Sequence, residues 1–227
     1  MKITWLGHNT WTIETAAGKI LLDPFLDDSP TAPLKSDAAE SDFLIVSHGH
    51  FDHVGDAVPI AQRTGATVVA NFEVGNWLAG QGVLEEKLVQ LNPGGGADLP
   101  FGRVAMTIAH HSSSLPDGSY GGVACGVLLN VDGKRLYFAC DTALFLDMKL
   151  IGAGGLDLAV VPIGDRFTMG PDDAVEAVKL LSPRLAAPCH YGTWPPIKQD
   201  ASAWAEKVRR HTAAEPLTPA AGESFDV

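Results

Sequence analysis

Three imidazoles and one carboxylate lie within six residues of this chain, in the segment His48-Gly49-His50-Phe51-Asp52-His53. Imidazole nitrogen and carboxylate oxygen are the ligands that zinc and the neighbouring divalent transition metals favour. Side chains at i and i+2 of an extended chain point the same way, so His48 and His50 can bind one ion together. Asp52 and His53 come after the chain has turned and can face a second ion. The segment therefore predicts a metal site rather than a loop of solvated histidines.

Further candidate ligands follow the ends of predicted strands. In an open α/β sheet, sites form beyond the carboxyl ends of the strands, so residues far apart in the sequence can converge there. Two metal ions need about eight to ten donors, water included, and the chain supplies enough. The residues concerned are His8 after 2–6, His110 and His111 after 104–109, Asp141 after 135–139, Asp165 after 156–162 and His190 after 184–188.

The elements that position these residues are predicted from apolar runs and turn signals to be alternating strands and helices. Asn92-Pro93-Gly94-Gly95-Gly96 is a flexible turn near the middle of the chain and is too short for an interdomain linker. We expect a layered α/β fold with helices outside a core of strands. Helices are expected over 55–64, 72–80, 171–181 and 201–210, and further strands over 10–15, 19–22, 43–46, 67–70 and 123–130.

Composition restricts the partners and the compartment. The net charge of −11 argues against nucleic acid or an anionic membrane as the main partner, because both require a basic surface. No apolar stretch is long enough for a signal peptide or a membrane span. The three cysteines form no C-x-x-C pair, as in a reduced cytosolic protein, so a cytoplasmic location is expected.

The candidate ligands, in their order and spacing, resemble those of the metallo-β-lactamase superfamily. Within it, the chain is similar to a branch of metal-dependent hydrolases (UPF0173-like) related to ascorbate-6-phosphate lactonase. The resemblance implies a single αββα sandwich domain over residues 1–227, with a two-metal site on one edge. The stretches that carry the branch resemblance are Trp5-Leu6-Gly7-His8, Leu22-Asp23-Pro24-Phe25, His111-Ser112-Ser113-Ser114, Pro162-Ile163-Gly164-Asp165 and Phe167-Thr168-Met169-Gly170-Pro171.

The family pattern implies a role for each candidate ligand. His48, His50 and a middle histidine would bind the first metal; Asp52, His53 and His190 would bind the second; and Asp141 would bridge the two. Spacing alone leaves His110 and His111 open as the middle histidine, and the resemblance favours His111, directly before the serine run. Asp52 and Asp141 are also candidate catalytic residues. Asp165 is a third, as a hydrogen-bond partner of a metal-bound histidine or of substrate, with a structural cap as the alternative.

The implied chemistry is hydrolysis. Two divalent ions roughly 3.5–4 Å apart can lower the pKa of a bridging water toward ~7, which supplies hydroxide without a serine or cysteine nucleophile. We expect zinc, with manganese, iron or nickel as alternatives, and a small-molecule ester, lactone or phosphodiester as substrate. The competing hypotheses are a mononuclear iron redox enzyme of the dioxygenase kind and a non-catalytic metal-binding protein. A homo-oligomer is the default expectation.

Some neighbouring residues allow two interpretations. Cys140 stands where the branch has glycine before the bridging aspartate; strand alternation favours a buried thiol over one that crowds Asp141. His8 is expected to support a ligand rather than to bind metal. Arg166 and Lys198 are the only nearby cations, which gives little support to phosphate recognition. Side chains that could line a pocket or belong to the core are Phe167, Met169, Tyr191 and Trp194, and candidate lids are residues 29–37 and 112–121.

Overall fold

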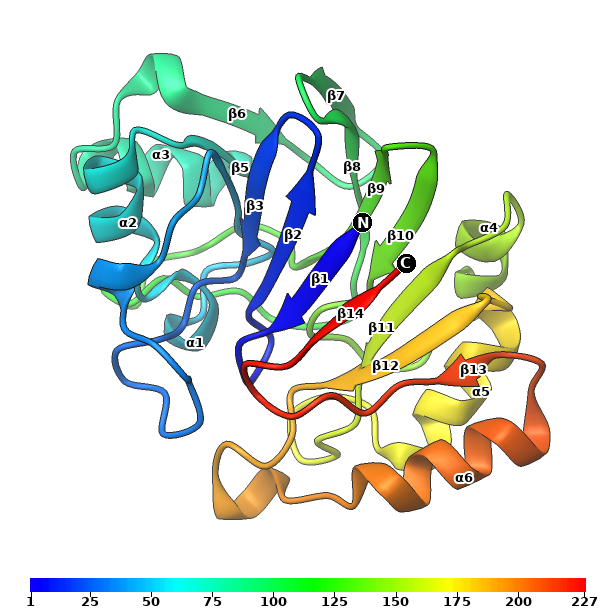
Figure 1. The fold of residues 1–227 in the computed structure, drawn as a ribbon. Helices are drawn as coiled ribbons and strands as arrows, with labels where there is room; N and C mark the ends of the chain where they lie inside the picture. The colour runs from blue at the N-terminus through cyan, green and yellow to red at the C-terminus, as the bar shows by residue number, and fades with distance from the viewer.

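The structure is a computed structural model that describes residues 1–227, and its centre is a pair of seven-stranded β-sheets (Figure 1). The first sheet has the strand order β14-β1-β2-β3-β4-β5-β6. Its strands are β1 (Lys2–Trp5), β2 (Trp11–Thr15), β3 (Gly18–Leu22), β4 (Phe43–Ile45), β5 (Thr67–Asn71), β6 (Leu88–Leu91) and β14 (Ser224–Asp226).

The second sheet has the order β13-β12-β11-β10-β9-β8-β7. Its inner pairs β10–β11 and β11–β12 are parallel, as are β3–β4 and β4–β5 in the first sheet. Parallel neighbours place their carboxyl ends at the same edge, which is the edge that a site can use. The strands are β7 (Gly96–Leu99), β8 (Gly102–Ile108), β9 (Cys125–Val131), β10 (Lys134–Phe138), β11 (Leu158–Pro162), β12 (Leu185–Cys189) and β13 (Glu215–Pro216).

Helices cover the outer face of each sheet (Figure 1). The helix α5 begins with Pro171 at its first position and carries acidic residues in its first turn, both favourable at a helix N-terminus. The α-helices are α1 (Phe51–Val54), α2 (Ala57–Thr64), α3 (Phe72–Gly80), α4 (Met148–Gly152), α5 (Pro171–Leu181) and α6 (Ala201–His211), and the short 3₁₀ helices are η1 (Ser36–Ala38), η2 (Glu85–Lys87) and η3 (Pro195–Ile197).

Three apolar clusters hold these layers together. The largest lies between the sheets, where the rings of Trp11 and Phe138 from opposite sheets are 6.1 Å apart. The second packs α5 and α6 on the second sheet through residues such as Trp204, and the third packs α2 and α3 on the first sheet through Ile60 and Leu78. Burying each such side chain stabilises the fold by about 1.5–3 kcal/mol. The layers are therefore helix, sheet, sheet, helix, which confirms the predicted αββα sandwich.

The glycine-rich segment 92–96 has a specific place in this architecture. It joins β6, the last strand of the first sheet, to β7, the edge strand of the second, so the chain changes sheets there. The predicted helices over 72–80 and 171–181 have the observed bounds, whereas β6, β7, β13, β14 and α4 were not predicted. No helix has the length and apolar character needed to cross a bilayer.

Candidate metal centre

The predicted ligands meet at one edge of the sandwich because they follow strand ends in both sheets. His48 follows β4 of the first sheet, while His111, Asp141 and His190 follow β8, β10 and β12 of the second. The short helix α1 then presents Asp52 and His53 from the turn after His48 and His50. The structure thus brings together all seven residues predicted as ligands, in three overlapping groups of candidate ligand atoms.

Several residues at these strand ends have a left-handed backbone. The φ angles of His8, Asp23, Cys140 and His190 are 49°, 45°, 53° and 53°. Such a conformation costs a non-glycine residue about 1–3 kcal/mol and persists only where the surrounding structure enforces it. A backbone hydrogen bond from His190 N to His8 O, 2.9 Å long, ties two of these residues together across the edge.

The first ligand group consists of three imidazole nitrogens. His48 Nε2 lies 2.9 Å from His50 Nδ1, which lies 3.3 Å from His111 Nε2. Two nitrogens bound to one tetrahedral zinc at 2.0–2.1 Å are about 3.3 Å apart. The spacing of the three nitrogens therefore suits a shared metal ion.

The other ring nitrogen of each of two histidines is occupied, which fixes the nitrogen left for metal. Ser47 Oγ donates to Asp23 Oδ2 at 2.6 Å and so accepts from His48 Nδ1 at 3.0 Å. His50 Nε2 lies 3.4 Å from Ser112 Oγ, and with Nδ1 bound to a metal it would donate to that hydroxyl. Hydrogen bonds of this kind select the tautomer and orient the ring of a metal ligand. His48 is left with Nε2 and His50 with Nδ1, the two atoms that face each other.

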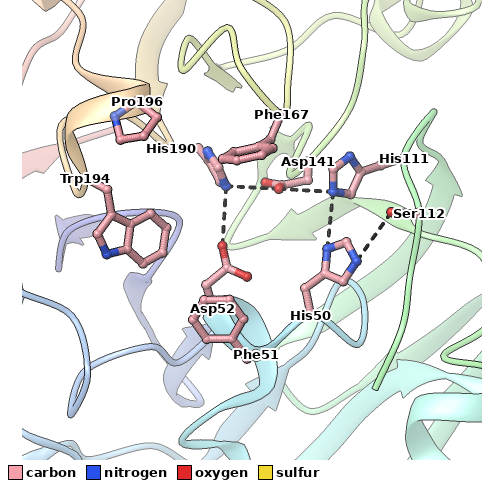
Figure 2. Close-up of a pocket in the computed structure, with 10 residues that line it drawn as sticks. All are labelled: His50, Phe51, Asp52, His111, Ser112, Asp141, Phe167, His190, Trp194 and Pro196. Atoms are coloured by element: carbon pink, nitrogen blue, oxygen red, sulfur yellow. Dashed lines mark hydrogen bonds and ion pairs between the residues drawn. The ribbon is translucent and has the colours of Figure 1, made fainter. Parts of the chain in front are cut away.

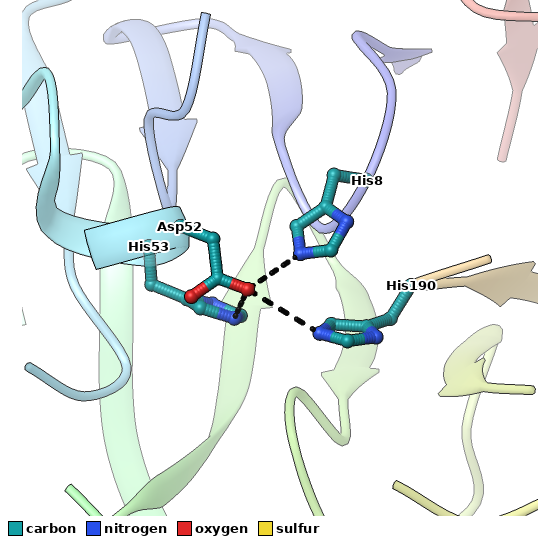
Figure 3. Close-up of side chains that lie close together, drawn as sticks. All are labelled: His8, Asp52, His53 and His190. Carbon is teal, nitrogen blue, oxygen red and sulfur yellow. Dashed lines mark hydrogen bonds and ion pairs between the residues drawn. The ribbon is translucent and has the colours of Figure 1, made fainter. Parts of the chain in front are cut away.

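The second group combines imidazole with carboxylate. Asp52 Oδ2 lies 3.8 Å from His53 Nε2 and 3.7 Å from His190 Nε2 (Figure 3). Asp141 lies between the two groups: its Oδ2 is 3.0 Å from His190 Nε2 and 3.5 Å from His111 Nε2, and its Oδ1 is 3.4 Å from His53 Nε2. Asp141 is therefore placed to serve both groups, as a bridging ligand must.

Buried polar atoms without a hydrogen-bond partner concentrate in this second group. They include His53 Nε2, Asp141 Oδ1 and His190 Nε2. A buried polar atom without a partner costs about 1–3 kcal/mol, and each such atom in a folded protein needs an explanation. A divalent cation among these atoms supplies the missing partner. The donor set thus fits the binding of divalent metal.

Asp23 is a site residue that was named from the sequence only within the stretch Leu22–Phe25, with no role of its own. Its fully buried carboxylate accepts hydrogen bonds from Ser47 N at 2.7 Å, Ser47 Oγ at 2.6 Å, Asn9 Nδ2 at 2.8 Å and His53 Nδ1 at 2.8 Å. The bond to His53 leaves Nε2 of that ring for a metal. Asp23 also acts on His48 through Ser47, so one carboxylate orients a ligand in each group. Its position after β3 was the available signal.

His8 belongs to the same group of candidate ligand atoms as Asp52, His53 and His190, and its contact within that group is with Asp52 (Figure 3). His8 Nε2 donates to Asp52 Oδ2 at 2.9 Å, and His8 Nδ1 accepts from Thr193 Oγ1 at 2.8 Å. Both ring nitrogens are therefore in use. This agrees with the expectation that His8 supports a ligand.

The pKa values of the protein chain show how these charges are balanced. Burial raises the pKa of Asp141, but the neighbouring His190 and His53 outweigh burial and hold it well below its usual range. Burial lowers the pKa of His190, but Asp141 and Asp52 raise it to about 9. Burial, together with His53, lowers the pKa of His48 well below its ordinary value, so His48 is neutral and can bind metal. In the metal-free protein, protons on the imidazoles of the second group thus supply positive charge beside the Asp141 carboxylate. Bound cations would supply that charge instead.

The structure shows where the remaining candidate residues, His110, Asp165 and Cys140, lie relative to the ligands. His110 is exposed and lies against Phe145, so His111 alone of the pair reaches the cluster. Asp165 is also exposed, its side chain makes no hydrogen bond, and Asp23 takes the role proposed for it as partner of a ligand histidine. Cys140 is fully buried and its Sγ donates to Phe138 O at 3.5 Å, away from Asp141, as expected of a buried thiol.

A pocket of about 510 Å³ opens onto the ligands. Figure 2 shows His50, His111 and Ser112 on one side of it and Trp194 and Pro196 on the other. Phe51 and Phe167 also line it, whereas Met169 is buried in the core beneath α5. Tyr191 is stacked on Trp5 at 5.3 Å and does not line the pocket. Of the candidate lid 112–121, only Ser112 reaches the pocket.

Comparison with known proteins agrees with this geometry. Residues 19–191 match the family model described as a beta-lactamase superfamily domain. A UPF0173 metal-dependent hydrolase of Symbiobacterium thermophilum is 43% identical over 99% of both chains, and one of Thermus thermophilus is 44% identical over 92% of both. The solved structure of Igni18, a metallo hydrolase from Ignicoccus hospitalis, is 33% identical, with a TM-score of 0.89 over 100% of this chain and 98% of that one.

Proposed function

Since the chain belongs to the metallo-β-lactamase superfamily, and within it to the UPF0173 family of metal-dependent hydrolases, we propose that it hydrolyses a small-molecule ester, lactone or phosphodiester with two divalent ions. The observation that carries this proposal is that Asp141 contacts both ligand groups, through His111 on one side and through His53 and His190 on the other. A redox site with a single metal ion would need only one of these two ligand groups.

Each ligand group has its own ion to hold. His48, His50 and His111 would hold the first ion, and Asp52, His53 and His190 would hold the second. Asp141 contacts both groups. Two bound divalent ions supply hydroxide at neutral pH and polarise a carbonyl or phosphoryl oxygen. The three-imidazole group is a common zinc environment, so we assign zinc to it.

Asp52 is the residue best placed to orient the attacking water. It lines the pocket, and its side chain is 11% exposed. Burial raises its pKa, but His53, His190 and His8 together hold the pKa below its usual range, so Asp52 is a carboxylate at neutral pH. His8 donates to Oδ2 and fixes the orientation of the carboxylate. Asp52 can therefore accept a hydrogen bond from water in a defined direction.

The chain offers no competing covalent nucleophile at the pocket. Cys125, Cys140 and Cys189 are all buried, and burial raises the pKa of each thiol, that of Cys125 to about 12. Ser112 lines the pocket, but the only group its hydroxyl meets is His50 Nε2, which would carry a proton once Nδ1 of that ring binds a metal. No base is placed to activate this serine. Hydrolysis by water is therefore the chemistry that the residues support.

The test compares two adjacent histidines. We expect His111→Ala to lose about one of two bound metals and most of the hydrolysis of a panel of lactones, esters and phosphodiesters. His110→Ala is the matched control, because this ring is exposed beside the site, and it should keep both metals and full turnover. Metal analysis and steady-state kinetics give the two readouts. Equal effects of the two substitutions, or oxygen consumption by an iron-loaded protein that hydrolyses nothing, would contradict the proposal.

A further inference from the structure

The part of the pocket beyond the ligands is almost entirely apolar. Five of its ten lining residues belong to the ligand set, and the other five are Phe51, Phe167, Trp194, Pro196 and Ser112. Ser112 lies on the side of His50 and His111, opposite Trp194 and Pro196 (Figure 2). A substrate that reaches past the metals toward Trp194 therefore meets aromatic rings and a proline, and no polar side chain.

These rings come from three separate segments that the fold brings to one place. Phe51 begins α1, Phe167 lies in the loop after β11, and Trp194 directly precedes η3. Phe51 contacts Phe25 edge to face at 5.8 Å and lies 6.0 Å from Trp194, so two of the rings are packed in one aromatic cluster. Yet Phe51 and Phe167 remain 56% and 57% exposed. Large aromatic surfaces left in water around a pocket indicate a binding surface.

The same surface has no cationic side chain that could bind an anionic group of a substrate. No lysine or arginine lines the pocket, although the chain has 16 of these residues. Arg166 and Lys198, adjacent in sequence to the lining segments, are exposed and do not line the pocket. A phosphate or carboxylate held here, away from the ions, would lose hydration without gaining a partner, which is costly.

On the basis of the proposed function, we propose that the substrate is an ester or lactone whose non-reacting part is uncharged and carries an aromatic ring or a bulky alkyl group. Phe51, Phe167 and Trp194 are then the residues that select it. Aromatic rings prefer offset or edge-to-face contacts with other rings, and the two packed rings and Phe167 offer such faces to the pocket. Phosphorylated lactones, by contrast, are poor substrates.

The first experiment measures binding and needs no turnover. Three hydroxamic acids share one metal-binding head and differ in the remainder: phenylacetohydroxamic, acetohydroxamic and sulfoacetohydroxamic acid. Titration calorimetry with the zinc-loaded protein should show the phenyl compound binding at least tenfold more tightly than the methyl compound. The sulfonate compound should bind no more tightly than the methyl one. Equal affinities for all three, or preference for the sulfonate, would overturn the inference.

Two variants locate the effect. Phe167→Ala and Trp194→Ala should each reduce affinity for the phenyl compound about five- to tenfold and leave acetohydroxamic acid unchanged. Phe72→Ala is the matched control, since Phe72 is a 48% exposed phenylalanine at the start of α3, outside the pocket. An equal loss in the control would refute the assignment of these rings. Melting temperatures and metal content establish that the variants are folded and loaded.

Turnover then separates the two proposals. A phenyl-substituted γ-lactone should have at least a tenfold higher kcat/KM than the unsubstituted lactone, and a phosphorylated lactone a lower one. Selective binding of the phenyl hydroxamate without hydrolysis of any ester or lactone would contradict the proposed function and leave the binding inference standing. Hydrolysis of small or phosphorylated lactones as fast as the phenyl lactone would support the proposed function and contradict the inference about the substrate's apolar part.

Discussion

Asp23→Asn should weaken metal binding although Asp23 touches no metal. One of its oxygens accepts three hydrogen bonds and the other accepts one, from Ser47 N at 2.7 Å. An amide cannot satisfy both sides, because its NH₂ group must face at least one donor. The unsatisfied donor costs about 1–3 kcal/mol of folding stability. Loss of the charge that supports His53, a ligand of the second group, should reduce affinity for one ion by about 10- to 100-fold.

Chelator competition followed by metal analysis measures the affinity for each ion, and denaturant unfolding of the metal-free protein measures the stability. Asp56→Asn is the matched control: Asp56 is a buried carboxylate that accepts from two backbone amides, Leu26 N and Asp27 N, and contacts no ligand. It should keep both affinities, and since both amides donate to Oδ2, the side-chain carbonyl of asparagine can accept them in the same way. The reasoning is refuted if Asp23→Asn binds both ions as tightly as the wild type, or if the control loses as much affinity.

Three further predictions address His190, His8 and Cys140. Burial lowers the pKa of His190, but Asp141 and Asp52 raise it to about 9, above the ordinary 6.5. Protonated His190 therefore stabilises the metal-free fold below pH 6.5, on the order of 3 kcal/mol, and this is lost as pH rises through 9. Thermal melts should show the decline in metal-free protein; an equally steep decline in metal-free His190→Gln would be inconsistent with this origin. His8→Ala should lower kcat about 10- to 100-fold with metal content unchanged, because Asp52 loses its hydrogen-bond donor. His8→Gln should restore part of the lost kcat. Unchanged kcat in the alanine variant would rule out the positioning role. Cys140→Val should lower the free energy of unfolding by more than about 1 kcal/mol, since a β-branched residue is disfavoured at φ 53°. Cys140→Gly should keep full metal content. A valine variant as stable as the wild type would show that the backbone at this position is unstrained.

The sequence was most informative where local spacing and strand ends carry the signal. The spacing of His48, His50, Asp52 and His53 is local, and the structure brings all four to one edge. The rule that ligands follow strand ends also located Asp141 and His190. The same rule named Asp165, whose side chain is exposed and makes no hydrogen bond in the structure, so its role stays a prediction.

Other features depend on contacts that no local pattern encodes. Asp23 follows a predicted strand like the ligands, but its importance comes from donors in three other segments, at Asn9, Ser47 and His53. The choice between His110 and His111 depends on how the chain leaves β8, which spacing does not specify. The edge strand β14 has three residues and pairs with β1 from the opposite end of the chain, so its pairing was not predictable from its own sequence.

The central claim is that one edge of the sandwich holds two ions. A crystal of the zinc-loaded protein, measured on both sides of the zinc absorption edge, tests this directly. Two anomalous peaks are expected, one among His48, His50 and His111 and one among Asp52, His53 and His190, with Asp141 contacting both. A single peak, or two peaks that do not share Asp141, would contradict it.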